Sequence, residues 1–352
     1  MSKSIENLYV RLIRAAASSW LVSLCLFPLA LLSYFFRAAA ALRRVVYVRR
    51  AGRRTVTTPV ISVGNITVGG TGKTPFISLL LNHLTGKIGL ATRGYRRAVH
   101  GLYVTPGSIC SPRRGGDEAT LIGRRHPSIT IAVSDDKWEA VHSLDGRCDL
   151  IVLDDGLARY DIPQRLQIAT VDCQCPDGYG WLLPRGLCRE PFSRLRDVDY
   201  IVITNADASL PALCSSLRPF SRPLIVTEPV IQRFFCPDGS TFPLARGQAV
   251  ALMSGIAHPE YFRRSMVAMG FDVVDHLILK DHADITDKKV LSFAAKVRSS
   301  VPDAIVVGTE KDFFRKETWP AIPLCFSQME LCIIEGHEAF AALLVQVSKL
   351  GT

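Results

Sequence analysis

Short apolar runs rich in valine and isoleucine recur between residues 60 and 203, and stretches with helical spacing separate them. Six of these runs predict strands: Val60–Val63, Ile88–Ala91, Ile129–Val133, Leu150–Leu153, Ile168–Val171 and Tyr200–Ile203. Strands that alternate with helices usually form a parallel sheet with helices on both faces. The hydrophobic pattern therefore predicts an α/β fold for this part of the chain.

A second alternation of strands and helices follows a proline-rich interval, Pro219–Pro243, which we interpret as a linker that contains extended ribbon. Its predicted elements are strand Ala249–Met253, helix Pro259–Met269, strand Val273–Leu279, helix Asp287–Arg298, strand Ala304–Val307 and a last helix, Glu338–Lys349. We expect an N-terminal membrane-associated segment in residues 1–40, a larger domain in 41–222, the linker in 223–246 and a smaller α/β domain in 247–352. The last helix would pack on either domain.

Residues Trp20–Phe36 are almost entirely apolar, and arginines flank them on both sides. As a helix, these 17 residues would span about 25 Å, slightly less than the hydrocarbon core of a bilayer, and Pro28 would kink it. A single tilted span and a buried core helix are open alternatives, whereas a cleaved signal peptide is disfavoured because no small-residue cleavage site follows. We favour a helix that lies in the membrane surface, since the flanking arginines would face anionic headgroups.

The charge balance is basic, with 42 lysines and arginines against 32 aspartates and glutamates and a formal net charge of +10 in 352 residues. Such an excess suits phosphates, anionic lipids or nucleic acid. Seven arginines crowd into residues 37–54, which favours a membrane surface, and no aromatic-basic motif or zinc-finger spacing supports nucleic-acid binding. The ten cysteines include no C-x-x-C pair, so we expect free thiols in a reducing cytosol.

A glycine-rich turn lies between the first predicted strand and a predicted helix, Phe76–Leu84. The turn reads Thr67-Val68-Gly69-Gly70-Thr71-Gly72-Lys73-Thr74. This order is typical of a phosphate-binding loop, in which backbone N–H groups and a helix N-terminus face a phosphate. Lys73 would reach the β- and γ-phosphates, and the Thr74 hydroxyl would hold Mg²⁺. Thr67 stands where the usual spacing has glycine, so an ordinary glycine turn is the alternative.

Two acidic pairs are candidates for metal binding and catalysis. Asp154-Asp155 ends the strand Leu150–Leu153, where a carboxylate assists Mg²⁺ binding in phosphate-loop enzymes, and Asp154 is the better metal candidate. A strand that ends in an Asp-Gly turn is the alternative, which the preceding phosphate loop disfavours. Asp117-Glu118 follows two glycines and would supply a base and a metal ligand. The alternative is a helix start, because carboxylates favour a helix N-terminus.

Three further motifs suit chemistry in a binding cleft. Asp281-His282 has the composition of an acid–base pair, and Arg189-Glu190 lies in a loop that suits an anionic group. Thr309-Glu310-Lys311-Asp312 follows a predicted strand and is compatible with a turn that reads a nucleotide base. Each has an ordinary surface loop or strand-to-helix turn as its alternative.

Taken together, these segments resemble the tetraacyldisaccharide 4'-kinase family, the lipid A 4'-kinases. The matching segments appear in the family's order over residues 60–312: Val63–Pro75, Arg93-Gly94-Tyr95, Gly116-Asp117-Glu118, Asp154-Asp155-Gly156-Leu157, Arg189-Glu190-Pro191, Ser254-Gly255-Ile256, Pro259-Glu260, Asp281-His282 and Thr309–Asp312. Thr67 in place of the first loop glycine is itself typical of this family. Any one segment is weak evidence, whereas the combination is specific.

The resemblance implies a P-loop NTPase-type sheet domain and a reaction that depends on ATP and Mg²⁺. The γ-phosphate of ATP would pass to the 4'-hydroxyl of a tetraacylated disaccharide 1-phosphate, a lipid A precursor, at the cytoplasmic face of the inner membrane. The protein would act as a monomer at the membrane surface, without nucleic acid.

The resemblance also implies roles for individual residues. Asp117 would be the base on the 4'-hydroxyl, with His282 paired to it, and Lys73 would stabilise the transferring phosphoryl group. The loop Thr67–Thr74 would bind ATP. The metal-binding candidates are Thr74, Glu118, Asp154 and Asp155. The candidates for binding the acceptor or its phosphate are Arg93, Tyr95, Arg189 and Glu190.

One departure and two rival functions accompany this interpretation. The family usually continues Asp-Asp-Gly-Leu with Gln-His, and here Ala158 and Arg159 occupy those positions. A membrane-recruited P-loop ATPase or switch without a lipid acceptor would share the loop, and its nucleotide hydrolysis would not depend on lipid. A non-enzymatic membrane-binding protein with a degenerate loop is the second rival, against which the intact Lys73, Thr74 and Asp154 argue.

Overall fold

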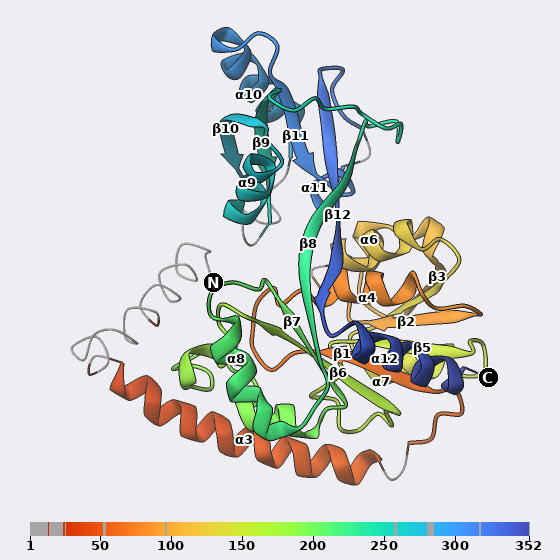
Figure 1. The fold of residues 1–352 in the computed structure, drawn as a ribbon. Helices are drawn as coiled ribbons and strands as arrows, with labels where there is room; N and C mark the ends of the chain where they lie inside the picture. The colour runs from red at the N-terminus through yellow and green to blue at the C-terminus, as the bar shows by residue number, and fades with distance from the viewer. Residues whose placement is uncertain are drawn as a thin grey trace.

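One continuous sheet runs through the molecule and joins two lobes (Figure 1). The computed structural model describes residues 13, 24, 26–51, 54–95, 97–256, 259–279, 285–316 and 318–351. Within them, twelve strands follow the order β10-β9-β11-β12-β8-β7-β6-β1-β5-β2-β4-β3. The nine cysteines in this part of the chain are free thiols.

The larger lobe contains the parallel sheet that the hydrophobic pattern predicts. Its parallel strands are β1 (Val60–Gly64), β2 (Ile88–Thr92), β4 (Thr130–Val133), β5 (Leu150–Asp154), β6 (Leu166–Asp172) and β7 (Tyr200–Thr204). A short strand that was not predicted, β3 (Tyr103–Pro106), pairs antiparallel with β4 at the edge. The α/β fold class is confirmed.

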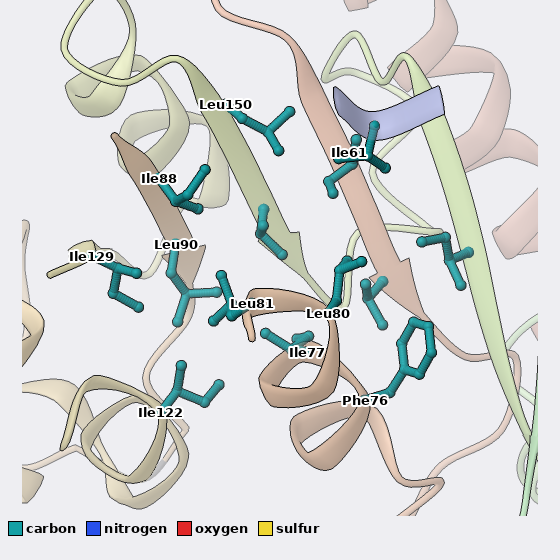
Figure 2. Packing of buried hydrophobic residues seen from close by; sticks show 14 of the residues in the cluster. Ile61, Phe76, Ile77, Leu80, Leu81, Ile88, Leu90, Ile122, Ile129 and Leu150 are labelled. Carbon is teal, nitrogen blue, oxygen red and sulfur yellow. The ribbon is translucent and has the colours of Figure 1, made fainter. Parts of the chain in front are cut away.

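Helices cover both faces of this sheet because its strands are apolar on both sides. α4 (Lys73–Leu81), α6 (Asp117–Arg125) and α12 (His337–Leu350) pack on one face, and α7 (Lys137–Leu144) and α8 (Leu210–Leu217) on the other. Figure 2 shows Ile61 of β1 on the same face as Phe76 and Leu80 of α4. The last helix therefore packs on the larger lobe, where Phe340 and Leu343 join this core. α5 (Pro112–Gly115) is a single turn before α6.

The smaller lobe repeats the pattern with three parallel strands, β9 (Ala249–Ser254), β10 (Asp272–Ile278) and β11 (Ile305–Thr309). Alternate residues of β9 point to opposite faces. Ala251 and Met253 pack with α10 (Asp287–Ser300), and Val250 and Leu252 pack with α9 (Pro259–Ala268). α11 (Glu310–Phe313) follows β11 directly.

Two long antiparallel strands connect the lobes, β8 (Leu224–Phe235) and β12 (Leu324–Glu335). β8 lies in the proline-rich interval expected to contain extended ribbon and also pairs with β7, while β12 also pairs with β11. Strand β12 was not predicted, because Ser327, Gln328 and Glu330 interrupt its apolar pattern. The two units thus share one sheet, not two.

The N-terminal helix differs from the one expected. α3 (Phe27–Ala51) has Pro28 in its first turn, where a missing N–H costs little, and residues 20–23 and 25 of the expected helix lie outside the described residues. The helix continues through the arginine cluster because those side chains find partners: Arg43 contacts Glu190 at 3.3 Å. Ser33 accepts a hydrogen bond from the Arg185 N–H (3.0 Å) and donates one to the Leu182 carbonyl (2.8 Å). Among the described residues, no helix is both long and apolar enough to cross a membrane.

The remaining turns of helix are 3₁₀ segments on the loops that surround the sheet. They are η1 (Gly107–Ile109), η2 (Gly178–Gly180), η3 (Phe192–Asp197) and η4 (Arg218–Phe220). The η2 and η3 segments flank the loop that carries Arg189, so this loop is held close to the end of β1, where the Arg189 N–H donates to the Ile66 carbonyl at 2.7 Å.

Candidate active site

The glycine-rich turn has the backbone of an anion-binding loop. Gly72 caps α4 with a φ of 75°, and Gly69 has a φ of 113°, both in the region that favours glycine. A Cβ at Gly72 would lie 2.7 Å from Cγ2 of Thr204, so the close approach of β7 also requires glycine there. Lys73 and Thr74 occupy the first turn of α4, half-buried at the start of the helix. The N-terminus of α4 therefore faces the space in front of the loop.

Threonines under the loop hold its backbone in place. The Thr204 hydroxyl donates to the Thr71 carbonyl at 3.2 Å, and the Thr71 and Thr170 hydroxyls lie 2.9 Å apart. Thr170 in turn donates to the Gly64 carbonyl at 3.2 Å. On its outer side the loop receives a backbone bond, from Val68 N–H to the Leu187 carbonyl at 2.8 Å. These bonds leave the loop organised before any ligand arrives.

Asp154 ends β5 next to the loop, because β5 pairs with β1 and Asp154 is opposite Val63. Its Oδ2 accepts a hydrogen bond from the Thr92 hydroxyl at 2.8 Å, whereas Oδ1 is buried without a hydrogen-bond partner in the described structure. Burial, reinforced by the Glu118 charge, raises the pKa of Asp154 to about 6, and the Lys137 and Lys73 ammonium groups oppose this only in part. A buried carboxylate oxygen without a hydrogen-bond partner has the chemistry of a cation ligand.

Asp155 is adjacent in sequence but has a different environment. It has a φ of 54°, and its carboxylate accepts two hydrogen bonds from the Arg189 guanidinium, at 2.9 and 2.7 Å. Burial alone would raise the pKa of Asp155, but the Lys137 ammonium and the Arg189 guanidinium hold it far below its usual range. Its oxygens are committed to these partners. The structure therefore separates the two aspartates, and Asp154 has the oxygen suited to a metal.

Lys137 is a site residue that the sequence analysis missed. Its ammonium donates to the Asp155 carbonyl at 2.5 Å and lies 3.6 Å from the Asp155 carboxylate. Burial lowers the pKa of Lys137, and the charges of Asp155 and Asp154 counteract that effect. Its position at the start of the helix that follows β4 could have predicted this role, because the carboxyl ends of parallel strands lie at the same edge of the sheet.

Asp117 and Glu118 occupy the first turn of α6, beside the end of β2. The preceding Gly116 has a φ of 81°, and a Cβ there would meet the Tyr95 carbonyl at 2.8 Å. The α6 N-terminus therefore packs against the turn that carries Arg93 and Tyr95, which are exposed. The Glu118 charge contributes, after burial, to the raised pKa of Asp154.

The structure places the predicted residues in three different settings. Lys73, Thr74, Asp117, Glu118 and Asp154 lie around the loop, and His282, together with Asp281, lies outside the described residues. Arg189 uses its guanidinium on Asp155 and on the Asn65 side chain and carbonyl. Glu190 is buried and accepts hydrogen bonds from Arg43 (3.3 Å) and Tyr160 (3.2 Å). The side chain of Glu190 thus faces α3, while its backbone N–H donates to the carbonyl of Ile66, the residue before the phosphate loop, at 3.2 Å.

Arg159, which departs from the family pattern, belongs to a separate ion-pair network. Its guanidinium donates to the carboxylates of Asp161, at 2.8 and 2.9 Å, and Asp136, at 2.7 Å. Asp161 is buried and also contacts Arg54. These contacts join the segment after β5 to the segment after α3 and place the Arg159 guanidinium at Asp136, the residue before Lys137.

Comparison with known proteins agrees with the site. The profile of the tetraacyldisaccharide-1-P 4'-kinase family matches residues 25–349. The chain belongs to this family. It is 33% identical over 312 residues to the tetraacyldisaccharide 4'-kinase of Anaeromyxobacter dehalogenans (strain 2CP-C), covering 82% of this chain and 80% of that one. It is 35% identical over 309 residues to the enzyme of the same name from Stenotrophomonas maltophilia (strain R551-3), covering 84% and 87%.

A solved structure shares the fold. The crystal structure of the "apo" form of LpxK from Aquifex aeolicus in complex with ATP superposes with a TM-score of 0.70, covering 92% of this chain and 98% of that one at 22% sequence identity. As a member of the tetraacyldisaccharide-1-P 4'-kinase family, the chain is a kinase of lipid A biosynthesis. This membership argues against the non-enzymatic membrane-binding alternative.

Proposed function

We propose that this kinase transfers the γ-phosphate of ATP to the 4'-hydroxyl of tetraacyldisaccharide 1-phosphate. The observation that carries the proposal is the meeting of a phosphate loop and acidic side chains at one edge of the sheet. The charges of Glu118 and Lys73 both act on the pKa of the Asp154 carboxyl group, in opposite directions. Phosphoryl transfer needs this kind of site, because its catalysis consists mainly of positioning and electrostatic stabilisation.

ATP fits the loop for two reasons. The glycine backbone and the start of α4 offer N–H groups to its phosphates, with Lys73 beside them. In addition, the Aquifex aeolicus relative of the same fold was crystallised with ATP. The threonines under the loop would keep these donors fixed, so little reorganisation would accompany binding.

Mg²⁺ suits the oxygen donors beside the loop. Asp154 has a buried oxygen without a hydrogen-bond partner, and Thr74 and Glu118 would complete the set with phosphate oxygens and water. Among the described residues, no three histidine, cysteine, aspartate or glutamate side chains form a metal cluster on their own. When bound, the ion would neutralise charge on the β- and γ-phosphates.

The reaction assigns a distinct role to Asp117. Its carboxylate would take the proton of the 4'-hydroxyl as the new O4'–P bond forms and the bond from the γ-phosphorus to the bridging oxygen breaks, releasing ADP. Lys73 would stabilise the transferring phosphoryl group. Arg189 would keep Asp155 in place and so support the strand end that carries Asp154. Arg93 and Tyr95 would face the acceptor from the exposed turn after β2.

We further propose that α3 binds the cytoplasmic face of the inner membrane, where a monomer would reach its lipid acceptor. The helix exposes apolar side chains, including Phe35 (73% exposed), Leu31 and Leu32, together with arginines. A cavity of about 450 Å³ lies between α3 and the loop before Arg189, lined by Ser33, Tyr34 and Trp181 among others. Co-sedimentation with anionic vesicles that is lost in Phe35→Asp would support this placement, and unchanged binding would contradict it.

Transfer of label tests the function. The purified protein is incubated with Mg²⁺, γ-labelled ATP and tetraacyldisaccharide 1-phosphate in detergent, with Lys73→Ala as the control. The proposal predicts that label enters the lipid only with the wild-type protein. ATP hydrolysis that proceeds without labelled lipid, and at the same rate when lipid is absent, would favour the switch or ATPase alternative.

A further inference from the structure

The turn Thr309-Glu310-Lys311-Asp312 makes contacts with the larger lobe that neither interpretation of its sequence anticipates. The turn begins α11. Glu310 of the turn and the nearby Arg315 contact the larger lobe, and Asp312 holds Arg315 in place. Thr309 caps the helix by accepting from the Asp312 N–H at 3.4 Å. The turn lies at the end of β11, directly beside α6 of the larger lobe, the helix whose first residue is Asp117.

One contact holds the C-terminal end of α6. Arg125, the last residue of α6, donates through Nε to both Glu310 carboxylate oxygens at 3.0 Å, and its Nη2 also contacts Glu310. The same Nη2 donates to the Met329 carbonyl at 2.7 Å. Only 12% of the Arg125 side chain and 8% of the Glu310 side chain are exposed. Water therefore screens this ion pair weakly, and its geometry is fixed from both lobes.

A second contact reaches the N-terminal end of the same helix. The Arg315 guanidinium lies 3.9 Å from the Asp117 carboxylate through Nε and donates to Asp312 at 3.1 Å through Nη1. Asp312 is completely buried, and its carboxylate accepts from the Thr309 hydroxyl (2.6 Å) and the Gly255 N–H (3.0 Å). Arg315 is thus fixed on the smaller lobe, with one edge facing Asp117.

From these contacts we propose that Glu310, Asp312 and Arg315 form a clamp that positions α6, and with it Asp117, for phosphoryl transfer. Glu310 holds one end of α6 through Arg125. Arg315, held by Asp312, sets the carboxylate of Asp117 at the other end. Arg315 and Glu310 are positioning residues in this account, since they act through Asp117. The clamp rests on the proposed function only for its catalytic consequence; the mechanical contact between α11 and α6 is independent of it.

Steady-state kinetics test the catalytic consequence. Glu310→Gln and Arg315→Gln are expected to lower kcat by about 10- to 100-fold, because a displacement of about 1 Å at a reacting group has effects of that size. The KM for ATP should change by less than about threefold, since the phosphate loop is untouched. Arg315→Lys retains the charge and should recover most of the rate. Lys316→Gln is the matched control, because Lys316 pairs with Asp287 within the smaller lobe.

Hydrogen exchange tests the contact without substrates. Glu310→Gln should lower the melting temperature, because Arg125 loses a buried partner, and should accelerate exchange of the α6 amides more than exchange of the α7 amides. Unchanged exchange of the α6 amides together with an unchanged kcat would contradict the proposed clamp. A loss of kcat that a smaller folded fraction explains fully would also contradict it. Failure of the wild-type protein to phosphorylate the lipid would instead overturn the proposed function, and the exchange measurement would still decide whether the clamp exists.

Discussion

Asp154 and Asp155 are consecutive residues at the end of β5, yet their surroundings shift the pKa values of the two carboxyl groups in opposite directions. Asp154 is buried beside Glu118 and keeps one oxygen without a hydrogen-bond partner. Asp155 adopts a left-handed backbone conformation that turns its carboxylate onto Arg189. The proposed function therefore gives the pair two tasks, in which Asp154 would bind a cation and Asp155 would organise the site.

Asparagine at each position should separate these tasks. Asp155→Asn leaves Arg189 and Lys137 without their anion and should lower the free energy of unfolding by about 2 kcal/mol. Burial disfavours the charged form of Asp154, so Asp154→Asn should leave the free energy of unfolding without nucleotide unchanged or raise it. The rate of phosphoryl transfer should fall by about 100-fold or more. Urea denaturation and initial rates measure both effects. Equal destabilisation by the two variants would contradict the division of roles.

Gly72→Ala should impair the phosphate loop. A side chain at this position would adopt an unfavourable φ of 75° and would lie 2.7 Å from Thr204, so the loop must shift away from its anion-binding geometry. We expect ATP affinity to fall by about tenfold or more. Gly239→Ala is the matched control, since Gly239 has a φ of 86° and an added Cβ would meet nothing within 4 Å. Binding of a fluorescent ATP analogue compares the variants. Equal affinities would argue against a phosphate loop whose geometry depends on Gly72.

Arg159→Ala should affect stability and leave catalysis intact. The substitution removes the hydrogen bonds to Asp136 and the buried Asp161, which should cost about 2 kcal/mol of unfolding free energy. The kcat per folded molecule should stay within about twofold, because the Arg159 side chain does not reach the loop. Thermal unfolding and transfer kinetics distinguish the effects. A large loss of kcat at unchanged melting temperature would show that Arg159 has taken over a task at the reaction centre.

His126 should make the fold sensitive to acid. Burial, and secondarily the charge of Arg125, lowers the pKa of His126 to about 4, and its Nε2 lies 2.8 Å from the Ser78 hydroxyl. The folded state thus binds fewer protons than the unfolded chain between about pH 6.5 and pH 4. The contribution of the neutral His126 to the free energy of unfolding is fully present above about pH 6.5 and is lost as the pH falls toward 4. Urea titrations across this range should show a smaller pH dependence for His126→Gln than for the wild type, and parallel curves would refute the assignment.

The sequence predicted the parallel sheet because its signal is local. Runs such as Val60–Val63 and Tyr200–Ile203 are apolar throughout, and helix-like spacing separates them. Strand β12 was missed because it pairs with β8 over more than 90 residues of sequence separation and alternates polar with apolar positions. The length of α3 was also missed, since its arginines are stabilised by distant partners such as Glu190 and Asp197.

The candidate site was predictable where a motif fixes local geometry. The glycine loop, Asp154 and Asp117 follow strand ends or begin helices, and the topology brings those ends together. Local patterns do not encode ion pairs between distant elements. Such pairs determine the environment of Asp155, the burial of Lys137 and the contacts of Arg315. The contact of Glu190 with Arg43 of α3 likewise depends on a distant element, and its role in acceptor binding stays a prediction.

The most direct test of the account is a single-turnover measurement with Asp117→Asn. Enzyme in excess of tetraacyldisaccharide 1-phosphate is mixed with ATP and Mg²⁺, the phosphate position in the product is determined by NMR, and ATP affinity is measured in parallel. We predict that wild-type protein places phosphate on the 4'-oxygen and that Asp117→Asn slows this step by about 100-fold or more with ATP affinity nearly unchanged. Transfer at the wild-type rate in Asp117→Asn, or phosphate at another position in the wild-type product, would contradict the account.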